Sequence, residues 1–213
     1  MANPVHTTAN GTKVLDPGTD HAAMIIMYRG LGIESGPKFA YDTAEWLISQ
    51  VKKSVSQSVL DRMILVAPFD YNQDCELCLQ QAKKLIDKRG GNITSYSLCG
   101  FSRGGQPLYK NISRHNWTII GLIDAVTPTM YGFGDDIVDK YSSKIRCIYG
   151  VSHWGSPRKH PAGPHDKKTG YEKIVDFHDH LTDLQVEMMD ATAQQGHSDM
   201  PGVFFQNYGS DFV

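Results

Sequence analysis

The chain has 213 residues, of which 40% are hydrophobic and 21% are charged, and its net charge is −2. This length suits one domain, residues 1–213, with enough chain to bury a sizeable core. The near-neutral charge argues against nucleic acid or an anionic membrane as a binding partner.

The sequence shows no pattern of a signal peptide or of a membrane-spanning segment. No apolar run approaches the length of a membrane span, and the polar N-terminus lacks the apolar core of a signal peptide. We therefore expect a cytoplasmic protein, or one associated with a phage particle or delivered by a secretion system.

The N-terminal part alternates short apolar runs with an amphipathic segment. Residues 1–20, rich in Thr, Asn, Gly and Pro, predict an irregular lead-in. Continuous apolar runs at Ala22–Tyr28 and Met63–Ala67 predict strands that are covered on both faces. Apolar residues at helical spacing between Ala40 and Val55 predict a helix that joins them.

The next helix carries two of the four cysteines. Cys75-x-x-Cys78 could be a redox or metal-binding pair, but no second Cys-x-x-Cys exists to complete a zinc site. Both cysteines belong to an apolar stripe at helical spacing, made up of Cys75, Cys78, Leu79, Ala82, Leu85 and Ile86. Buried, reduced thiols are the prediction that this stripe favours.

The most informative motif follows a predicted strand at Ile93–Leu98. Gly100-Phe101-Ser102-Arg103-Gly104 has the Gly-x-Ser-x-Gly pattern of a nucleophile elbow, and a predicted helix from about Arg103 to Arg114 follows it. The tight turn strains the serine, and glycines on either side leave room for it. An ordinary turn serine is the alternative reading.

Two further strands are predicted at Thr118–Ile123 and Ile145–Tyr149. Strands alternating with helices predict an α/β fold, with a mostly parallel central sheet and helices on both faces. Residues 150–182 show little periodicity and predict a lid or substrate-binding flap, with a short helix near Tyr171–Leu181. Alternation from Leu184 to Met188 favours a strand over a helix.

A catalytic serine needs a histidine that accepts its proton and a carboxylate that orients the histidine. Asp124 ends an apolar strand and is the favoured acid, with a turn aspartate as the alternative and Asp135 and Asp136 as weaker candidates. His197, near the C-terminus, stands where the order serine, acid, histidine requires the base. His153, close behind the strand Ile145–Tyr149, is the alternative base.

The remaining groups of this site are backbone donors. The N–H of Arg103 is one predicted oxyanion donor, and Gly30 or Leu31, in the loop after the first predicted strand, supplies the second. A metal site on the flap histidines is less favoured, because recognisable ligand spacing is missing among His160, His165, His178 and His180.

Three motifs together resemble a known group. Gly100–Gly105, Asp124-Ala125-Val126 and Gly196-His197-Ser198-Asp199 look like the α/β-hydrolases that include type VI secretion phospholipase effectors and their bacterial and phage relatives. The resemblance implies a compact α/β-hydrolase fold with Ser102, Asp124 and His197 as its triad.

These observations predict a serine hydrolase that cleaves a small-molecule or lipid-like carboxylic ester and needs no cofactor. A peptidase, amidase or thioesterase with the same triad remains an alternative, because leaving-group preference depends on pocket shape. A non-catalytic binding module with a hydrolase fold is the alternative from another class. The sequence leaves the oligomeric state open.

Overall fold

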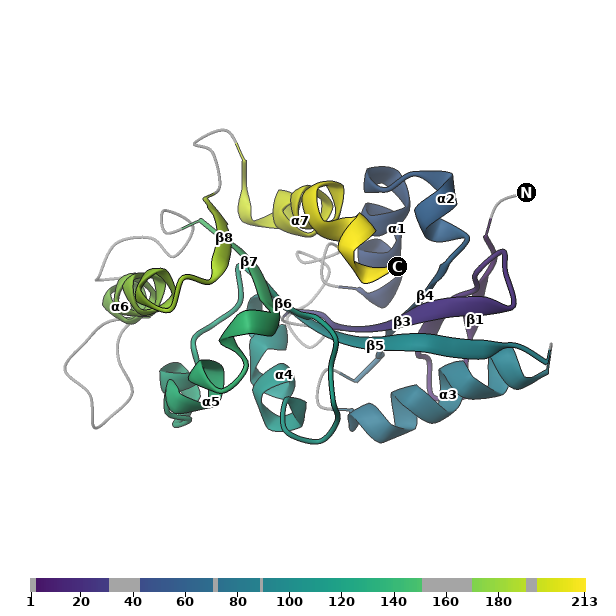
Figure 1. The fold of residues 1–213 in the computed structure, drawn as a ribbon, viewed down its shortest axis with the longest axis horizontal. Helices are drawn as coiled ribbons and strands as arrows, with labels where there is room; N and C mark the ends of the chain where they lie inside the picture. Colours follow the sequence, from purple (N-terminus) through teal and green to yellow (C-terminus); the bar gives the residue numbers. More distant parts are fainter. Residues whose placement is uncertain (1–2, 31–42, 71–72, 89, 151–169, 191–194) are drawn as a thin grey trace.

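The structure, a computed structural model, describes residues 3–30, 43–70, 73–88, 90–150, 170–190 and 195–213. In these residues one sheet of eight strands has the order β1-β2-β4-β3-β5-β6-β7-β8 (Figure 1). The strands are β1 (Val5–Thr7), β2 (Lys13–Leu15), β3 (His21–Tyr28), β4 (Met63–Ala67), β5 (Asn92–Phe101), β6 (Ile120–Ile123), β7 (Ile145–Tyr149) and β8 (Glu187–Asp190). Neighbours from β4 through β8 pair in parallel, whereas β2 is antiparallel to both β1 and β4.

Helices cover both faces of this sheet (Figure 1). One face carries α1 (Ala44–Ser54), α2 (Gln57–Leu60), α7 (Met200–Tyr208) and the 3₁₀ turn η8 (Gly209–Phe212). The other carries α3 (Cys75–Asp87), α4 (Gly105–Asn111), α5 (Asp136–Asp139) and α6 (Gly170–Asp183). Further 3₁₀ turns are η3 (Ser102–Gly104), η4 (Pro128–Tyr131), η5 (Ser142–Lys144) and η7 (His197–Asp199).

The two apolar layers explain why the central strands are continuous apolar runs. Along β3, Met24 and Ile26 face the layer under α3, while Ile25 and Met27 face the layer under α1. Successive side chains of a strand point to opposite faces, so β3, which is covered on both sides, is apolar at nearly every position.

Helices α1 and α3 begin where a polar side chain caps them. The hydroxyl of Thr43 accepts a hydrogen bond from Trp46 N at 3.0 Å, and the carboxylate of Asp74 accepts one from Glu76 N at 2.8 Å. These caps satisfy amides that the first helical turn leaves unpaired. The predicted thiol burial is confirmed, because Cys75 and Cys78 are fully buried and carry no disulfide.

Two sequence expectations need correction. The irregular lead-in over residues 1–20 contains the hairpin β1–β2, whose three-residue strands are too short to show a periodic pattern. Part of the expected flap, residues 170–182, belongs to α6, whose residues Ile174, Phe177 and Leu181 are buried in the core. Residues 151–169 of that flap lie outside the described residues.

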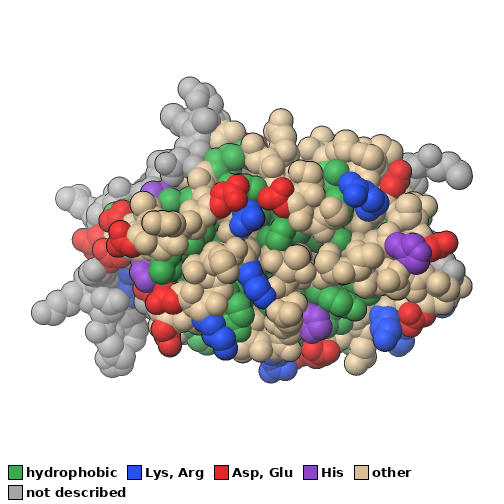
Figure 2. Space-filling view, in the orientation of Figure 1, with side chains coloured by type: hydrophobic (Ala, Val, Ile, Leu, Met, Phe, Trp, Pro, Cys, Tyr) green, Lys and Arg blue, Asp and Glu red, His purple; other side chains and the backbone are tan. Residues whose placement is uncertain are grey.

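The surface agrees with the small net charge. On the face in Figure 2, acidic, basic and histidine side chains are interspersed over the described residues. In the part of the chain that the structure describes, no helix combines the length and the apolar character needed to cross a membrane.

Candidate active site

The nucleophile elbow has the backbone that its motif predicts. Ser102 directly follows the last residue of β5 and has φ +54°, a left-handed conformation that is uncommon for a residue other than glycine. A Cβ atom on Gly100 would lie 2.6 Å from the carbonyl oxygen of Gly104. The turn therefore closes so tightly that a side chain at position 100 does not fit.

The elbow also lies against its two neighbouring strands. A Cβ atom on Gly104 would lie 2.3 Å from the carbonyl oxygen of Tyr28 and 2.7 Å from that of Arg29, at the end of β3. On the other side, Val126 N donates to the carbonyl oxygen of Ser102 at 3.0 Å. Ser102 is thus held between the segments that follow β3 and β6.

Asp124 occupies the end of β6, next to β5 in the sheet. It is fully buried and has φ +43°. The end of β7 holds it twice, because Asp124 N donates to the Ile148 oxygen at 2.7 Å and Oδ1 accepts from Gly150 N at 3.1 Å. These contacts leave the second carboxylate oxygen, Oδ2, to meet a group from elsewhere in the chain.

That group is His197, which lies in η7 after β8. Its Nδ1 is 2.5 Å from Asp124 Oδ2, and the ring is about 30% exposed. With Nδ1 protonated, the imidazole donates to the carboxylate and keeps a basic nitrogen at Nε2. The structure therefore brings together two of the predicted triad residues, which are separated by 73 positions in the chain.

The imidazole has a second contact, which the sequence analysis missed. The ring of Phe101 stacks on the ring of His197, with centroids 4.7 Å apart and planes inclined by 27°. Phe101 is the residue before Ser102 and is fully buried. The stack brings the histidine ring to the start of the elbow. A single sequence offers no signal for this stack, because the two x positions of the Gly-x-Ser-x-Gly pattern accept any residue.

The turn that carries His197 is fixed from both ends. Gly196 N donates to Asp199 Oδ2 at 2.8 Å, which closes the start of the turn. Directly after the turn, α7 buries Met200, Phe204 and Phe205 against the sheet. The histidine is therefore carried on an anchored turn.

The predicted oxyanion donors are placed only in part. Gly30 is buried directly behind Arg29, whose carbonyl oxygen contacts the elbow, and Arg103 lies in η3 beside Ser102. The buried Arg29 side chain donates through Nε and Nη2 to the carbonyl oxygen of Phe69, at 3.1 and 2.5 Å. It ties the segment after β3 to the segment after β4. Leu31 and the alternative base His153 lie outside the described residues.

The other described polar candidates lie on α5 and α6 or directly before α5. Asp135 and Asp136 stand at the start of α5, where burial is the main cause that raises the pKa of Asp135. On α6, His180 pairs with Asp139 at 2.6 Å, and His178 lies 4.0 Å from Asp179. His160 and His165 lie outside the described residues. Among the residues that are described, no group of three or more His, Cys, Asp or Glu is arranged to hold a metal.

Tyr149, the last residue of β7, is a buried phenol on the strand next to β6. Burial is the main cause that raises the pKa of Tyr149 well above its ordinary value, and the charges of neighbouring groups that include Asp124 add to it. The raised pKa means that Tyr149, at the end of β7, adds no negative charge to this end of the sheet.

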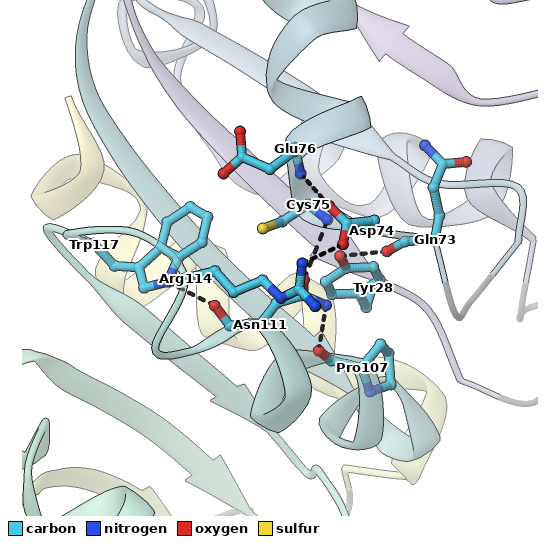
Figure 3. A network of polar contacts seen from close by, with 9 residues as sticks. All are labelled: Tyr28, Gln73, Asp74, Cys75, Glu76, Pro107, Asn111, Arg114 and Trp117. Atoms are coloured by element: carbon cyan, nitrogen blue, oxygen red, sulfur yellow. Dashed lines mark hydrogen bonds and ion pairs between the residues drawn. The ribbon is translucent and has the colours of Figure 1, made fainter.

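The helix behind the elbow is supported by buried hydrogen bonds (Figure 3). Asn111, at the end of α4, accepts from Cys75 N at 3.2 Å and donates to the carbonyl oxygen of Pro107 at 2.8 Å. Its own carbonyl oxygen accepts from Trp117 Nε1 at 3.3 Å. One side chain thus joins the start of α3 to α4, the helix that begins directly after the elbow.

These features define an α/β-hydrolase fold: a mostly parallel sheet in this strand order, helices on both faces, and a serine elbow after β5. The solved structures that share the fold agree with this description. The siderophore hydrolase EstB from Aspergillus nidulans has a TM-score of 0.57 at 10% identity, with 99% of this chain and 93% of that chain covered.

Two other α/β-hydrolases match over similar lengths. Carboxyl esterase 2 from the fungus Tuber melanosporum has a TM-score of 0.54 at 13% identity, covering 100% of this chain and 86% of its own. An α/β serine hydrolase without lid from Xanthomonas campestris has a TM-score of 0.52 at 13% identity, with 99% and 94% covered. No protein-family model matches the chain, and no curated protein matches its sequence. At these identities the likeness concerns the fold.

Proposed function

We propose that the protein is a serine hydrolase that cleaves carboxylic esters, with Ser102 as nucleophile, His197 as general base and Asp124 as the acid of a triad. The observation that carries the proposal is the contact between His197 Nδ1 and Asp124 Oδ2, on a ring stacked against the residue before Ser102. Acyl transfer needs a buried carboxylate that orients a partly exposed histidine toward a serine nucleophile, and here the histidine ring stacks on the residue directly before the strained serine.

In the proposed acylation, Ser102 Oγ attacks the ester carbonyl carbon while His197 Nε2 takes the hydroxyl proton. Asp124 holds the imidazole in the tautomer that has a basic Nε2, and it stabilises the imidazolium that forms. The imidazolium then gives its proton to the departing alcohol. An acyl group remains bound to Ser102 through a new ester bond.

Two backbone N–H groups would stabilise the oxyanion of the tetrahedral intermediate. We assign these roles to Arg103 and to Gly30 or Leu31. The support is the close approach of the Gly104 backbone to the carbonyl oxygens of Tyr28 and Arg29, directly before Gly30. Water, deprotonated by His197, would then release the acid from Ser102 and restore the enzyme.

The substrate class is argued from the solved structures that share the fold. An ester is favoured because the solved structures with this fold include a carboxyl esterase and a siderophore hydrolase. The motif resemblance to type VI secretion phospholipase effectors adds lipid-like esters as a class to try. A peptidase, amidase or thioesterase would use the same three residues, so the acyl donor has to be found by assay.

The test is covalent labelling with a fluorophosphonate, together with hydrolysis of short p-nitrophenyl esters. The intact protein should label and hydrolyse, and Ser102→Ala should lose both activities by about a thousandfold or more. Ser58→Ala, at an exposed serine in α2, is the matched control and should behave as the parent. A parent that neither labels nor cleaves any of the esters would favour the non-catalytic binding module.

A second pair of variants decides which histidine is the base. His197→Ala should reduce ester hydrolysis about as far as Ser102→Ala does, because serine and histidine act as a unit. His153→Ala should retain most of the activity. The reverse pattern would assign the base to His153 and leave the contact between His197 and Asp124 a structural one.

A further inference from the structure

The contact between Phe101 and His197 has a role that hydrogen bonding alone does not fill. The hydrogen bond from His197 Nδ1 to Asp124 Oδ2 sets the position of one edge of the imidazole, and a single hydrogen bond does not by itself define the plane of the ring. The ring of Phe101 lies 4.7 Å away at an inclination of 27°, so it fixes the plane of the imidazole. Fixing both the edge and the plane sets the direction of Nε2.

Phe101 is well placed to keep this plane constant. It is the last residue of β5, it pairs with Ile123 of β6, and its side chain is fully buried. Among the described residues, Phe101 also contacts the ring of Trp46 of α1, with ring centroids 5.7 Å apart. A buried ring on a central strand has little freedom to move, so the histidine rests on a rigid surface.

The stack also stabilises the positive charge of the protonated His197 ring. The face of an aromatic ring is negative, and it attracts a cation placed over it. Among the described residues, the charged side chains on the segments that carry the site are Asp124 directly after β6, Asp199 in the same turn as His197, and Arg103 next to Ser102 in η3. Among these contacts Phe101 gives the imidazolium an apolar face that favours its positive charge without adding a titrating group.

We propose, on the basis of the function proposed above, that Phe101 is a positioning residue of the reaction. Its ring aims His197 Nε2 at the serine hydroxyl, and it stabilises the imidazolium that forms as Ser102 loses its proton. Phe101 thereby holds the ring that accepts the proton in a fixed place relative to the sheet. The residue before the serine in the elbow then has a role in the reaction.

The first test compares Phe101→Leu with Trp46→Leu by ester hydrolysis across pH. Phe101→Leu should lower kcat about tenfold with KM nearly unchanged, because the ring acts through the histidine and does not touch substrate. The acidic limb of kcat/KM should move to lower pH by about half a unit, because the protonated ring loses a stabilising contact. Trp46→Leu removes the other ring on Phe101 and should leave the limb in place.

A second measurement does not depend on activity. In the Ser102→Ala background, the imidazole resonances of His197 are followed by NMR across pH, and they are assigned by their loss in His197→Asn. Adding Phe101→Leu should move the titration midpoint downward. If that variant does not fold, Phe101→Met fills similar space without an aromatic face and takes its place.

The outcomes separate the two proposals. Retained labelling in Ser102→Ala would overturn the proposed function, whereas the titration of His197 still reports on the stack. A folded Phe101→Leu with an unmoved midpoint and unchanged kcat would overturn the role of Phe101. An equal shift in Trp46→Leu would do the same, because it would show a general effect of packing.

Discussion

At the scale of single residues, Gly104 is the position where the elbow and the end of β3 come closest. A side chain there meets the backbone oxygens of Tyr28 and Arg29, which are unable to rotate away. Gly104→Ala should therefore destabilise the fold by about 3 kcal/mol and reduce ester hydrolysis as well. Urea unfolding and the p-nitrophenyl ester assay measure the two effects.

Gly90 is the matched control for this substitution. It has φ +70°, but a Cβ atom there would meet nothing within 4 Å. Gly90→Ala should cost about 1 kcal/mol, which is the strain of the left-handed backbone alone. Equal costs at the two positions would mean that the elbow does not press against β3 as closely as described.

How far the site could be predicted also depends on single residues. The motif and the strand ends led to Ser102, Asp124 and His197, and the structure joins the last two through a hydrogen bond. The roles of all three remain predictions. The stack on Phe101 and the support of Asp124 by Gly150 could not be foreseen, because both depend on how β7 and η7 meet β5 and β6 in space.

At the scale of elements, Asn111 joins the starts of two helices (Figure 3). Asn111→Ala would leave the amide of Cys75 without its partner in the interior, and should destabilise the protein by about 2–3 kcal/mol. Arg114→Ala removes an ion pair with Asp74 whose partners are 54% and 45% exposed, and should cost less than about 1 kcal/mol. Thermal or urea unfolding of the two variants gives the comparison, and a larger loss for Arg114→Ala would contradict it.

Elements with a strong local pattern could be predicted from the sequence. Met63–Ala67 and Ile145–Tyr149 have the predicted bounds, because each is a short run of mainly apolar residues between polar or helix-forming segments. The strands β1 and β2 were missed, because three residues show no period and gain their stability from pairing across the chain. The short helix expected near Tyr171–Leu181 lies within α6, but it was expected as part of a flap, whereas Ile174, Phe177 and Leu181 pack in the core.

At the scale of the whole molecule, burial of the thiols makes stability depend on alkaline pH. Burial raises the pKa of the Cys78 thiol to about 12, whereas its ordinary value is 9.0. Below pH 9 the thiol is neutral in both folded and unfolded chains, and stability is unaffected. Between about pH 9 and 12 only the unfolded chain ionises, so each such thiol lowers stability by about 1.4 kcal/mol per pH unit.

Urea unfolding from about pH 8 to pH 11 tests this dependence. The free energy of unfolding should fall above pH 9. In Cys78→Ala the slope of this free energy against pH should be smaller by the contribution of one titrating proton, about 1.4 kcal/mol per pH unit. Because other buried groups also titrate there, only the difference between the parent and the variant reports on Cys78. Parallel curves would show that the thiol ionises as freely in the folded protein as in the unfolded chain.

The left-handed backbone at Ser102 and Asp124 has a consequence for how this chain evolves. Glycine would recover about 1–2 kcal/mol of backbone strain at either position. At position 124 this gain is offset, because the buried amide of Gly150 and the ring of His197 would lose their carboxylate partner. Selection for stability alone would therefore drive position 102 toward glycine, and the hydroxyl of Ser102 is the group of the pair that a lineage without need of it would lose first.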